Sequence, residues 1–205
     1  MIKKIINPFR YISGWPALLT GIVGLLAMTG ISTVTNTHLD GVLDVHYAST
    51  GDLWVLAKEN AFTWFSLMLV FGLTGLILRG PTFRFLDLAG YTAFFRLPLI
   101  IAVLLPLFLD GSKVADYIIH ELMHTGEAIE LTTGDIIGFI LLTLLTILII
   151  FWSLLWGYLA FKSLFNIHGL KAAALFFVVI LLAELLVKIL LFLTGGFDTF
   201  MNIPT

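Results

Sequence analysis

Histidines and carboxylates gather in two polar stretches of a chain that is otherwise largely apolar. In the second stretch, the residues from His120 to His124 read H-E-x-x-H. On a helix this spacing places both imidazoles on one face, with their Cβ atoms about 5–6 Å apart, and Glu127 follows three residues after His124 on the same face. Two imidazoles and a carboxylate with one open position are the usual ligands of a catalytic zinc ion. In that interpretation Glu121 is the general base that takes a proton from metal-bound water.

The first polar stretch supplies a second set of possible ligands, so that the two stretches together hold four of the five histidines. One ion could join them, with imidazoles from the second stretch and a carboxylate or imidazole from the first. Such a metal could be purely structural, and the first stretch could also orient the imidazoles of the second. The chain has no cysteine, so any ligand must be nitrogen or oxygen, which suits zinc first and also iron or manganese. The ligands expected from the first stretch are His38, Asp40, Asp44 and His46.

A different interpretation of the second stretch involves no metal. Residues 117–130 could form an amphipathic helix that lies in the membrane interface, with histidines that bind nothing. Gly126 could end that helix and turn Glu127 away from the two histidines.

The elements that must position these residues are membrane spans. The chain has 205 residues, of which 60% are hydrophobic and 12% charged, and its mean hydropathy is +1.06. A span needs about 20 apolar residues, so the first apolar run is long enough to cross the bilayer and is not a signal peptide. The sequence predicts an all-α, polytopic membrane protein with a single domain, 1–205. Five spans are expected, over about 15–34, 61–78, 85–109, 135–161 and 172–193.

Basic residues predict the orientation of the spans. Only Lys58 and Lys113 lie on one predicted side, and seven basic residues lie on the other, which the positive-inside rule places in the cytoplasm. The amino terminus is then cytoplasmic, the carboxyl terminus is outside, and loops 35–60 and 110–134 are both extracytoplasmic. The net charge of −2 provides no basic surface for nucleic acid. The seven residues are Lys3, Lys4, Arg10, Arg79, Arg84, Lys162 and Lys171.

Charged residues inside the spans need partners. Arg96 is expected to face the bundle, with its guanidinium bound by carbonyls that Pro98 leaves free; the alternative is contact with an anion or a lipid headgroup. Glu184 and Lys188 are four residues apart in the favourable order for a helical ion pair. We expect them to neutralise each other in a structural role rather than to relay protons.

Short motifs lie before the first span, in the third span and around the turn between the last two: Asn7-Pro8-Phe9, Leu88-Ala-Gly-Tyr91 with Pro98, Ala160-Phe-Lys162 and Leu170-Lys-Ala-Ala173. In these motifs the chain resembles the Yip1 family of five-span membrane proteins. Residues 37–46 resemble a first-loop signature of a bacterial branch of that family. The resemblance implies the five-span fold and a place in the bacterial inner membrane. The long cytoplasmic extension of eukaryotic members, which act in vesicle traffic with small GTPases, is missing, so a trafficking role is not expected.

The expected function is that of a non-enzymatic, Yip1-like membrane protein whose two outer loops bind a divalent metal, with zinc as the first choice. Membrane lipids are expected partners, as is another protein or a second copy of the chain; no substrate is indicated. The main alternative is a membrane-embedded, zinc-dependent hydrolase or peptidase of the H-E-x-x-H type. A small transporter or lipid-binding protein is the second alternative, although no internal repeat is visible.

Overall fold

The computed structural model describes residues 5–47, 52–78, 84–123 and 130–194, apart from the side chains of Ile119, His120, Leu122 and Met123. Within these residues, five helical segments are long and apolar enough to cross a membrane, which confirms the predicted all-α membrane fold. The third segment is a broken helix made of three short pieces. The segments are α2 (Gly14–Thr35), α3 (Leu53–Ile77), α4 (Phe85–Phe94) continued by α5 (Leu99–Leu104) and η2 (Leu105–Leu107), α7 (Thr133–Phe165) and α8 (Gly169–Leu193).

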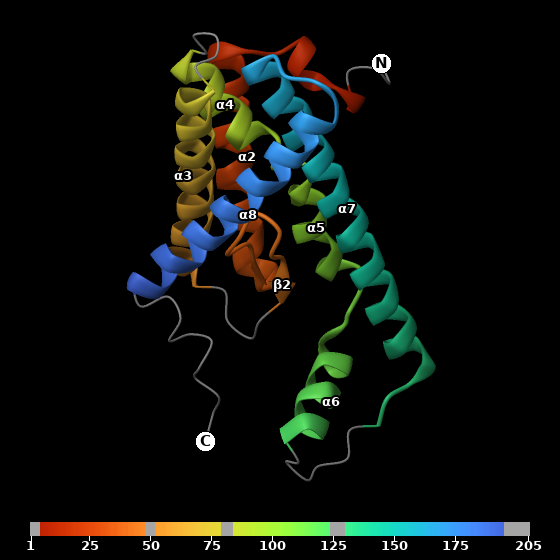
Figure 1. The fold of residues 1–205 in the computed structure, drawn as a ribbon. Helices are drawn as coiled ribbons and strands as arrows, with labels where there is room; N and C mark the ends of the chain where they lie inside the picture. Colours follow the sequence, from red (N-terminus) through yellow and green to blue (C-terminus); the bar gives the residue numbers. More distant parts are fainter. Residues whose placement is uncertain (1–4, 48–51, 79–83, 124–129, 195–205) are drawn as a thin grey trace.

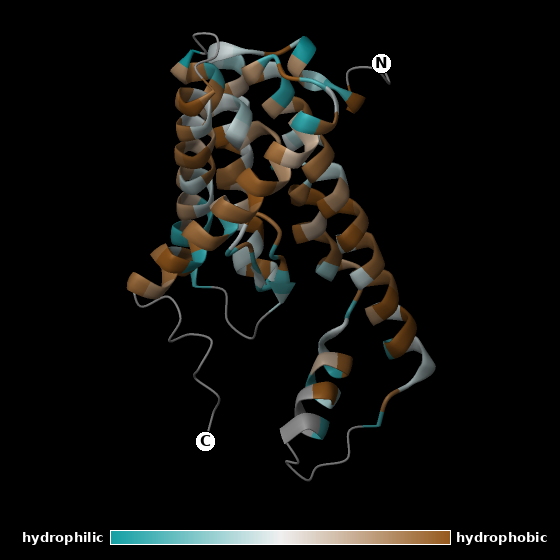
Figure 2. Cartoon of the chain, viewed as in Figure 1, coloured by the Kyte–Doolittle hydropathy of each residue, from teal (hydrophilic) through white to brown (hydrophobic). Residues whose placement is uncertain are grey.

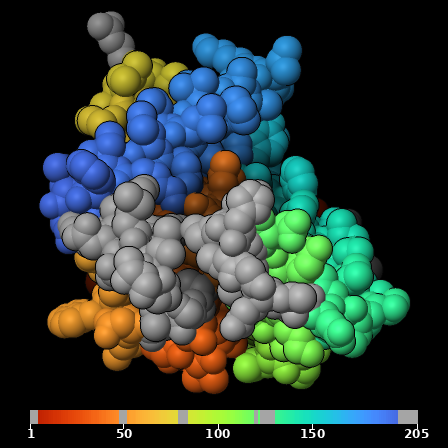
Figure 3. All heavy atoms as spheres, turned by 90° about the horizontal axis from the view of Figure 1, so that it is seen from below, coloured from red at the N-terminus to blue at the C-terminus, as the bar shows by residue number. Residues whose placement is uncertain are grey.

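The helices form a bundle in which α2 packs mainly against α4, and α3 packs against α8 (Figure 1). At the upper end of the view lies the short helix η1 (Pro8–Arg10). The lower end carries a small hairpin of β1 (Thr37–His38) and β2 (His46–Tyr47), together with α6 (Ser112–Met123). Both polar stretches therefore lie at the same end of the bundle, and Figure 3 shows this end with α8, α6 and the start of α3 all reaching the surface.

Hydrophobic residues cover the flanks of the bundle, and hydrophilic residues concentrate toward its two ends (Figure 2). Many large apolar side chains on the flanks are exposed, among them Leu26, Leu76 and Leu185. A lipid-facing surface can be entirely apolar, because lipid tails solvate apolar side chains and the backbone groups are hydrogen-bonded within each helix. The exposed apolar flank is therefore what a membrane-embedded bundle requires.

The second span begins earlier than the sequence predicts, at Leu53 rather than Ala61. Asp52 caps the helix by accepting hydrogen bonds from two backbone amides of its first turn, at 2.8 and 3.2 Å. Glu59 and Asn60, which were assigned to the loop because they are polar, therefore lie within α3 and are buried. The boundary was wrong because these polar side chains face the bundle interior rather than water.

The long helix α7 reaches beyond the rest of the bundle. Its 33 residues span about 50 Å, whereas the hydrocarbon core of a bilayer is about 30 Å thick. A capping box between Thr132 and Asp135 starts it. Helix α6, which lies within the predicted loop 110–134, packs beside the lower part of α7 rather than inside the bundle.

Close contact between α2 and α4 depends on glycine. A Cβ atom placed on Gly90 would lie 2.8 Å from the backbone nitrogen of Leu18, and one on Gly21 would lie 2.6 Å from the Cβ of Ala93. These two positions let the helix backbones approach more closely than any side chain would permit, as small residues commonly do in membranes.

Gly90→Ala should lower the free energy of unfolding by about 1–3 kcal/mol, because the added methyl group meets backbone rather than a movable side chain. The matched control is Gly30→Ala in α2, where no atom lies within 4 Å of the new Cβ. The control should be neutral or slightly stabilising, since alanine favours helix. Thermal unfolding of the detergent-purified protein, followed by circular dichroism, measures both. Equal melting temperatures for the two variants would contradict the proposed helix contact.

Candidate metal centre

The first polar stretch folds back as a hairpin at the end of α2. Asn36 ends α2 in the left-handed conformation, with φ of 50°, and β1 then pairs antiparallel with β2. The register places His38 directly opposite His46, and their rings stack with centroids 5.2 Å apart. Rather than extending into solvent, the start of this segment is buried, with Leu39 completely enclosed and Asp40 only 4% exposed.

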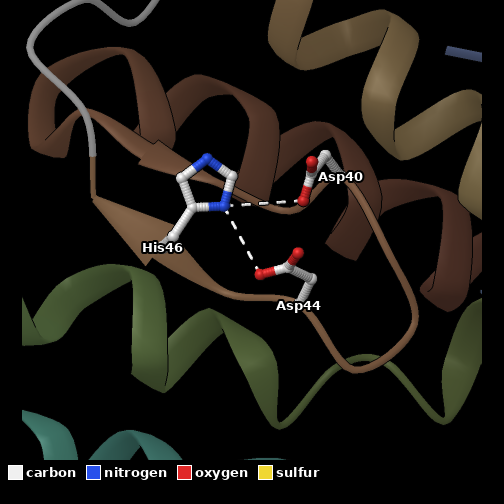
Figure 4. Close-up of side chains that lie close together, drawn as sticks. All are labelled: Asp40, Asp44 and His46. Atoms are coloured by element: carbon white, nitrogen blue, oxygen red, sulfur yellow. Dashed lines mark ion pairs between the residues drawn. The ribbon is translucent and has the colours of Figure 1, made fainter. Parts of the chain in front are cut away.

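Asp40, Asp44 and His46 converge at the closed end of this segment (Figure 4). Nδ1 of His46 lies 3.5 Å from Oδ1 of Asp40 and 3.5 Å from Oδ1 of Asp44. One ligand atom from each of the three residues lies within 4.8 Å of the others. Ligands bound at 2.0–2.2 Å to one ion would be about 3–3.5 Å apart, so a small contraction would seat a cation between them.

Helix α8 holds the two carboxylates in place from the opposite side. Nζ of Lys188 donates to Oδ2 of Asp40 at 2.8 Å and to Oδ2 of Asp44 at 2.7 Å. Each carboxylate therefore gives one oxygen to Lys188 and presents the other to His46. This division leaves Oδ1 of Asp40 without a hydrogen-bond partner and Oδ1 of Asp44 beside His46, while the ammonium group of Lys188 fixes the orientation of both side chains.

One helical turn earlier, Glu184 binds the backbone of the same segment. Its Oε2 accepts hydrogen bonds from the amides of Val42 at 2.6 Å and Leu43 at 3.1 Å. A Cβ atom on Gly41 would collide with this carboxylate, so any side chain there would have to displace Glu184 from the two amides. The expectation that Glu184 and Lys188 neutralise each other needs correction: in the described part of the chain no salt bridge joins them, and each binds the hairpin instead.

His38, another expected ligand, has a different partner. Its Nδ1 lies 2.8 Å from Oε1 of Glu59 on α3, and both side chains are buried. Because its ring also stacks on His46, His38 contacts the candidate centre from the side. Glu59 therefore fixes the ring of His38, and His38 in turn packs against the ring of His46.

The surroundings shift the pKa values of Asp40 and Asp44 in opposite directions. Burial raises the pKa of Asp40 above its ordinary value, and the charge of Asp44 raises it further, against the lowering effect of Lys188 and His46. The pKa of Asp44 is instead well below its usual range, chiefly because of its contact with His46 and then with Lys188. A cation beside both carboxylates would relieve their mutual repulsion.

Around the hairpin, negative charge exceeds fixed positive charge. With all four carboxylates ionised and with His38 and His46 neutral, four negative charges stand against two permanently cationic side chains, an excess of two. Such an excess is costly for the enclosed members of the set, Asp40 and Glu59, because buried charge needs compensation. One divalent cation would balance the set. The carboxylates are Asp40, Asp44, Glu59 and Glu184, and the cations are Lys188 and Arg96, on which the charge of Glu184 acts.

The second polar stretch is only partly described. Its helical part is α6, in which the side chain of Glu121 is exposed. The side chain of His120, and the residues His124 and Glu127, lie outside what the structure describes. A metal shared between the two stretches, or held by H-E-x-x-H alone, therefore stays a prediction.

Sequence reasoning chose the three converging residues but missed the side chains that hold them. Glu59 was placed in a loop, and Lys188 was expected to pair with Glu184 in the same helix. Their place in or beside the apolar runs could have identified these side chains. Ionisable residues within membrane spans are rare and usually pair with groups in the protein interior. Two aspartates in the adjoining loop were the available partners for a lysine in α8. Comparison of the chain with family models, curated proteins and solved structures finds no match.

Lys188→Met should lower the free energy of unfolding by about 1–3 kcal/mol in chelator-treated protein, because it leaves the buried Asp40 carboxylate without its ammonium partner. Adding Asp40→Asn to this variant should recover much of the loss. The matched control is Lys171→Met, at an exposed position near the start of the same helix, which should change stability by less than about 0.5 kcal/mol. Denaturant unfolding in detergent provides the measurement. Strictly additive effects of the two substitutions would show that the contact contributes nothing.

Proposed function

We propose that this chain is a Yip1-like integral membrane protein that binds a divalent metal ion through Asp40, Asp44 and His46. One observation carries the proposal. Oδ1 of Asp40 is a buried carboxylate oxygen without a hydrogen-bond partner, and it faces the ligand atoms of the other two residues. A buried polar atom in this state is costly unless something binds it.

The donor set favours a borderline or moderately hard cation. Two carboxylates and one imidazole suit zinc, manganese or iron, and the absence of sulfur disfavours softer ions. Three protein ligands leave at least one coordination position for water or for a ligand. The hydrolase alternative would use that position, with Glu121 as base only if the second polar stretch also brought its histidines to the ion. The non-enzymatic role is preferred because the described ligands come from the hairpin alone.

The proposed topology follows from the placement of basic residues. The amino-terminal end of α2 and the turn between α7 and α8 are cytoplasmic, and the hairpin and α6 are extracytoplasmic, in a bacterial inner membrane. The metal centre would then lie near the outer surface, with access to periplasmic cations.

Elemental analysis of the purified protein tests metal binding. Wild-type protein incubated with zinc or manganese and then desalted should retain about one equivalent per chain. His46→Ala and Asp40→Asn should retain almost none, whereas His168→Ala, at an exposed position in the turn before α8, should match the wild type. Retention of metal by His46→Ala combined with its loss in His120→Ala would transfer the site to the second stretch and overturn the proposal.

Labelling of introduced cysteines tests the topology, and the natural chain supplies a cysteine-free background. Asp116→Cys on the exposed face of α6 should react with a membrane-impermeant maleimide in intact spheroplasts. Leu170→Cys, at an 86% exposed position at the other end of the bundle, should react only after lysis. The opposite pattern would place the hairpin in the cytoplasm.

A further inference from the structure

Among the described residues, Arg96 is the largest side chain that the bundle encloses completely. It lies in the interrupted part of the third span, between α4 and α5, where the backbone amide of Arg96 bonds to the carbonyl of Ala93 in a tighter turn before Pro98. The sequence predicted that carbonyls freed by Pro98 would bind its guanidinium. The acceptor is instead the backbone carbonyl of Asn60 on α3, 3.4 Å from Nη1.

One edge of this guanidinium has no partner. Nε and Nη2 are both buried and make no hydrogen bond. These two nitrogens lie on the same edge of the planar group and form the fork that arginine uses to bind two oxygens of one carboxylate or phosphate. Nε and Nη2 of Arg96 are therefore placed to bind two oxygens of a single anion.

No described protein carboxylate occupies this fork. Among the described residues, no ion pair includes Arg96. The charge of Glu184 acts on it, but that carboxylate already accepts from the amides of Val42 and Leu43. Helices beside α4 and α5 carry further buried polar atoms without partners, namely Oγ of Ser32 and Ser66 and Oδ1 of Asn60, and the two hydroxyls could donate to an anion.

We propose that Arg96 binds the phosphate group of a ligand inside the bundle, and that the metal at Asp40, Asp44 and His46 favours this binding. The coupling rests on the proposed function, because an anion would enter a region with an excess of negative charge unless a cation first neutralised it. A phosphate could be free or could belong to a lipid headgroup.

A surface groove favours testing the lipid source directly. It runs along α2 and α3 and is lined mostly by apolar side chains, including Leu26, Leu53 and Trp54. Thr29 in its wall accepts a hydrogen bond at 3.2 Å from Asn60, the residue whose carbonyl binds Arg96. Through Thr29 and Asn60, the groove therefore borders the residues that contact Arg96.

The test is equilibrium binding to the full-length protein in detergent, with inorganic phosphate and with dioctanoyl phosphatidic acid as separate probes, each with and without Mn²⁺. Binding of inorganic phosphate would identify free phosphate as the source, and binding of phosphatidic acid alone would identify a lipid headgroup; both support the proposal. Mn²⁺ should raise the affinity about 5- to 150-fold. Binding of neither probe to metal-loaded protein would overturn the phosphate site while leaving the metal site standing.

The variant that tests the fork is Arg96→Lys, which keeps the charge but removes the two-nitrogen edge. Its affinity for the bound probe should fall at least about tenfold. Arg84→Lys, at an exposed position before α4, is the matched control and should bind as the wild type does. Unchanged affinity in Arg96→Lys would overturn the proposal.

A second measurement needs no substitution at Arg96. In wild-type protein labelled with ¹⁵N-arginine, the probe should shift the guanidinium Nε resonance of Arg96, and a spectrum unchanged at saturating probe would overturn the proposal. A protein that bound phosphate but no metal would refute the metal centre and its coupling to Arg96 while the phosphate site stood, so the two sites fail separately.

Discussion

Lys188 holds Asp40 and Asp44 by two short salt bridges, and this contact keeps a polar hairpin inside the end of an apolar bundle. A segment with exposed backbone amides and two carboxylates would otherwise prefer water. Glu184, one turn away, binds two of those amides, so a single face of α8 compensates both the charge and the backbone of the hairpin. The depth of the hairpin, and with it the position of His46, depends on these two side chains.

The same contacts explain why the centre is suited to a cation. Lys188 binds only one oxygen of each aspartate, and the remaining oxygens face His46. The buried pair His38–Glu59 closes the other side of the stacked histidines. The ammonium group of Lys188 thus orients both carboxylates, and the carboxylate oxygens that face His46 keep an excess of negative charge. Arg96, enclosed in the bundle, keeps an unpartnered fork on which the charge of Glu184 acts, so the proposed cation and anion sites would be electrostatically coupled.

Several features of the fold could be predicted from the sequence because they depend on local properties. Runs of apolar residues long enough for the bilayer gave five spans, and all five are present. The start of α3 was misplaced because Glu59 and Asn60 are polar, and polarity alone does not distinguish a solvated loop from a helix face turned toward other polar groups. Arg96 was expected to face the bundle, and it does, but its acceptor on α3 is 36 residues away in sequence.

The sequence by itself determined that the chain is a membrane protein and that Asp40, Asp44 and His46 are candidate ligands, since hydropathy and the chemistry of side chains are properties of the residues alone. Only the tertiary structure decided which charges meet. Glu184 and Lys188 suit each other by helical spacing, yet each binds residues more than 140 positions away. Within the low dielectric of the bundle, a buried carboxylate and unpaired amides cost more than an ion pair on the surface of one helix returns, so folding directs both side chains to the hairpin.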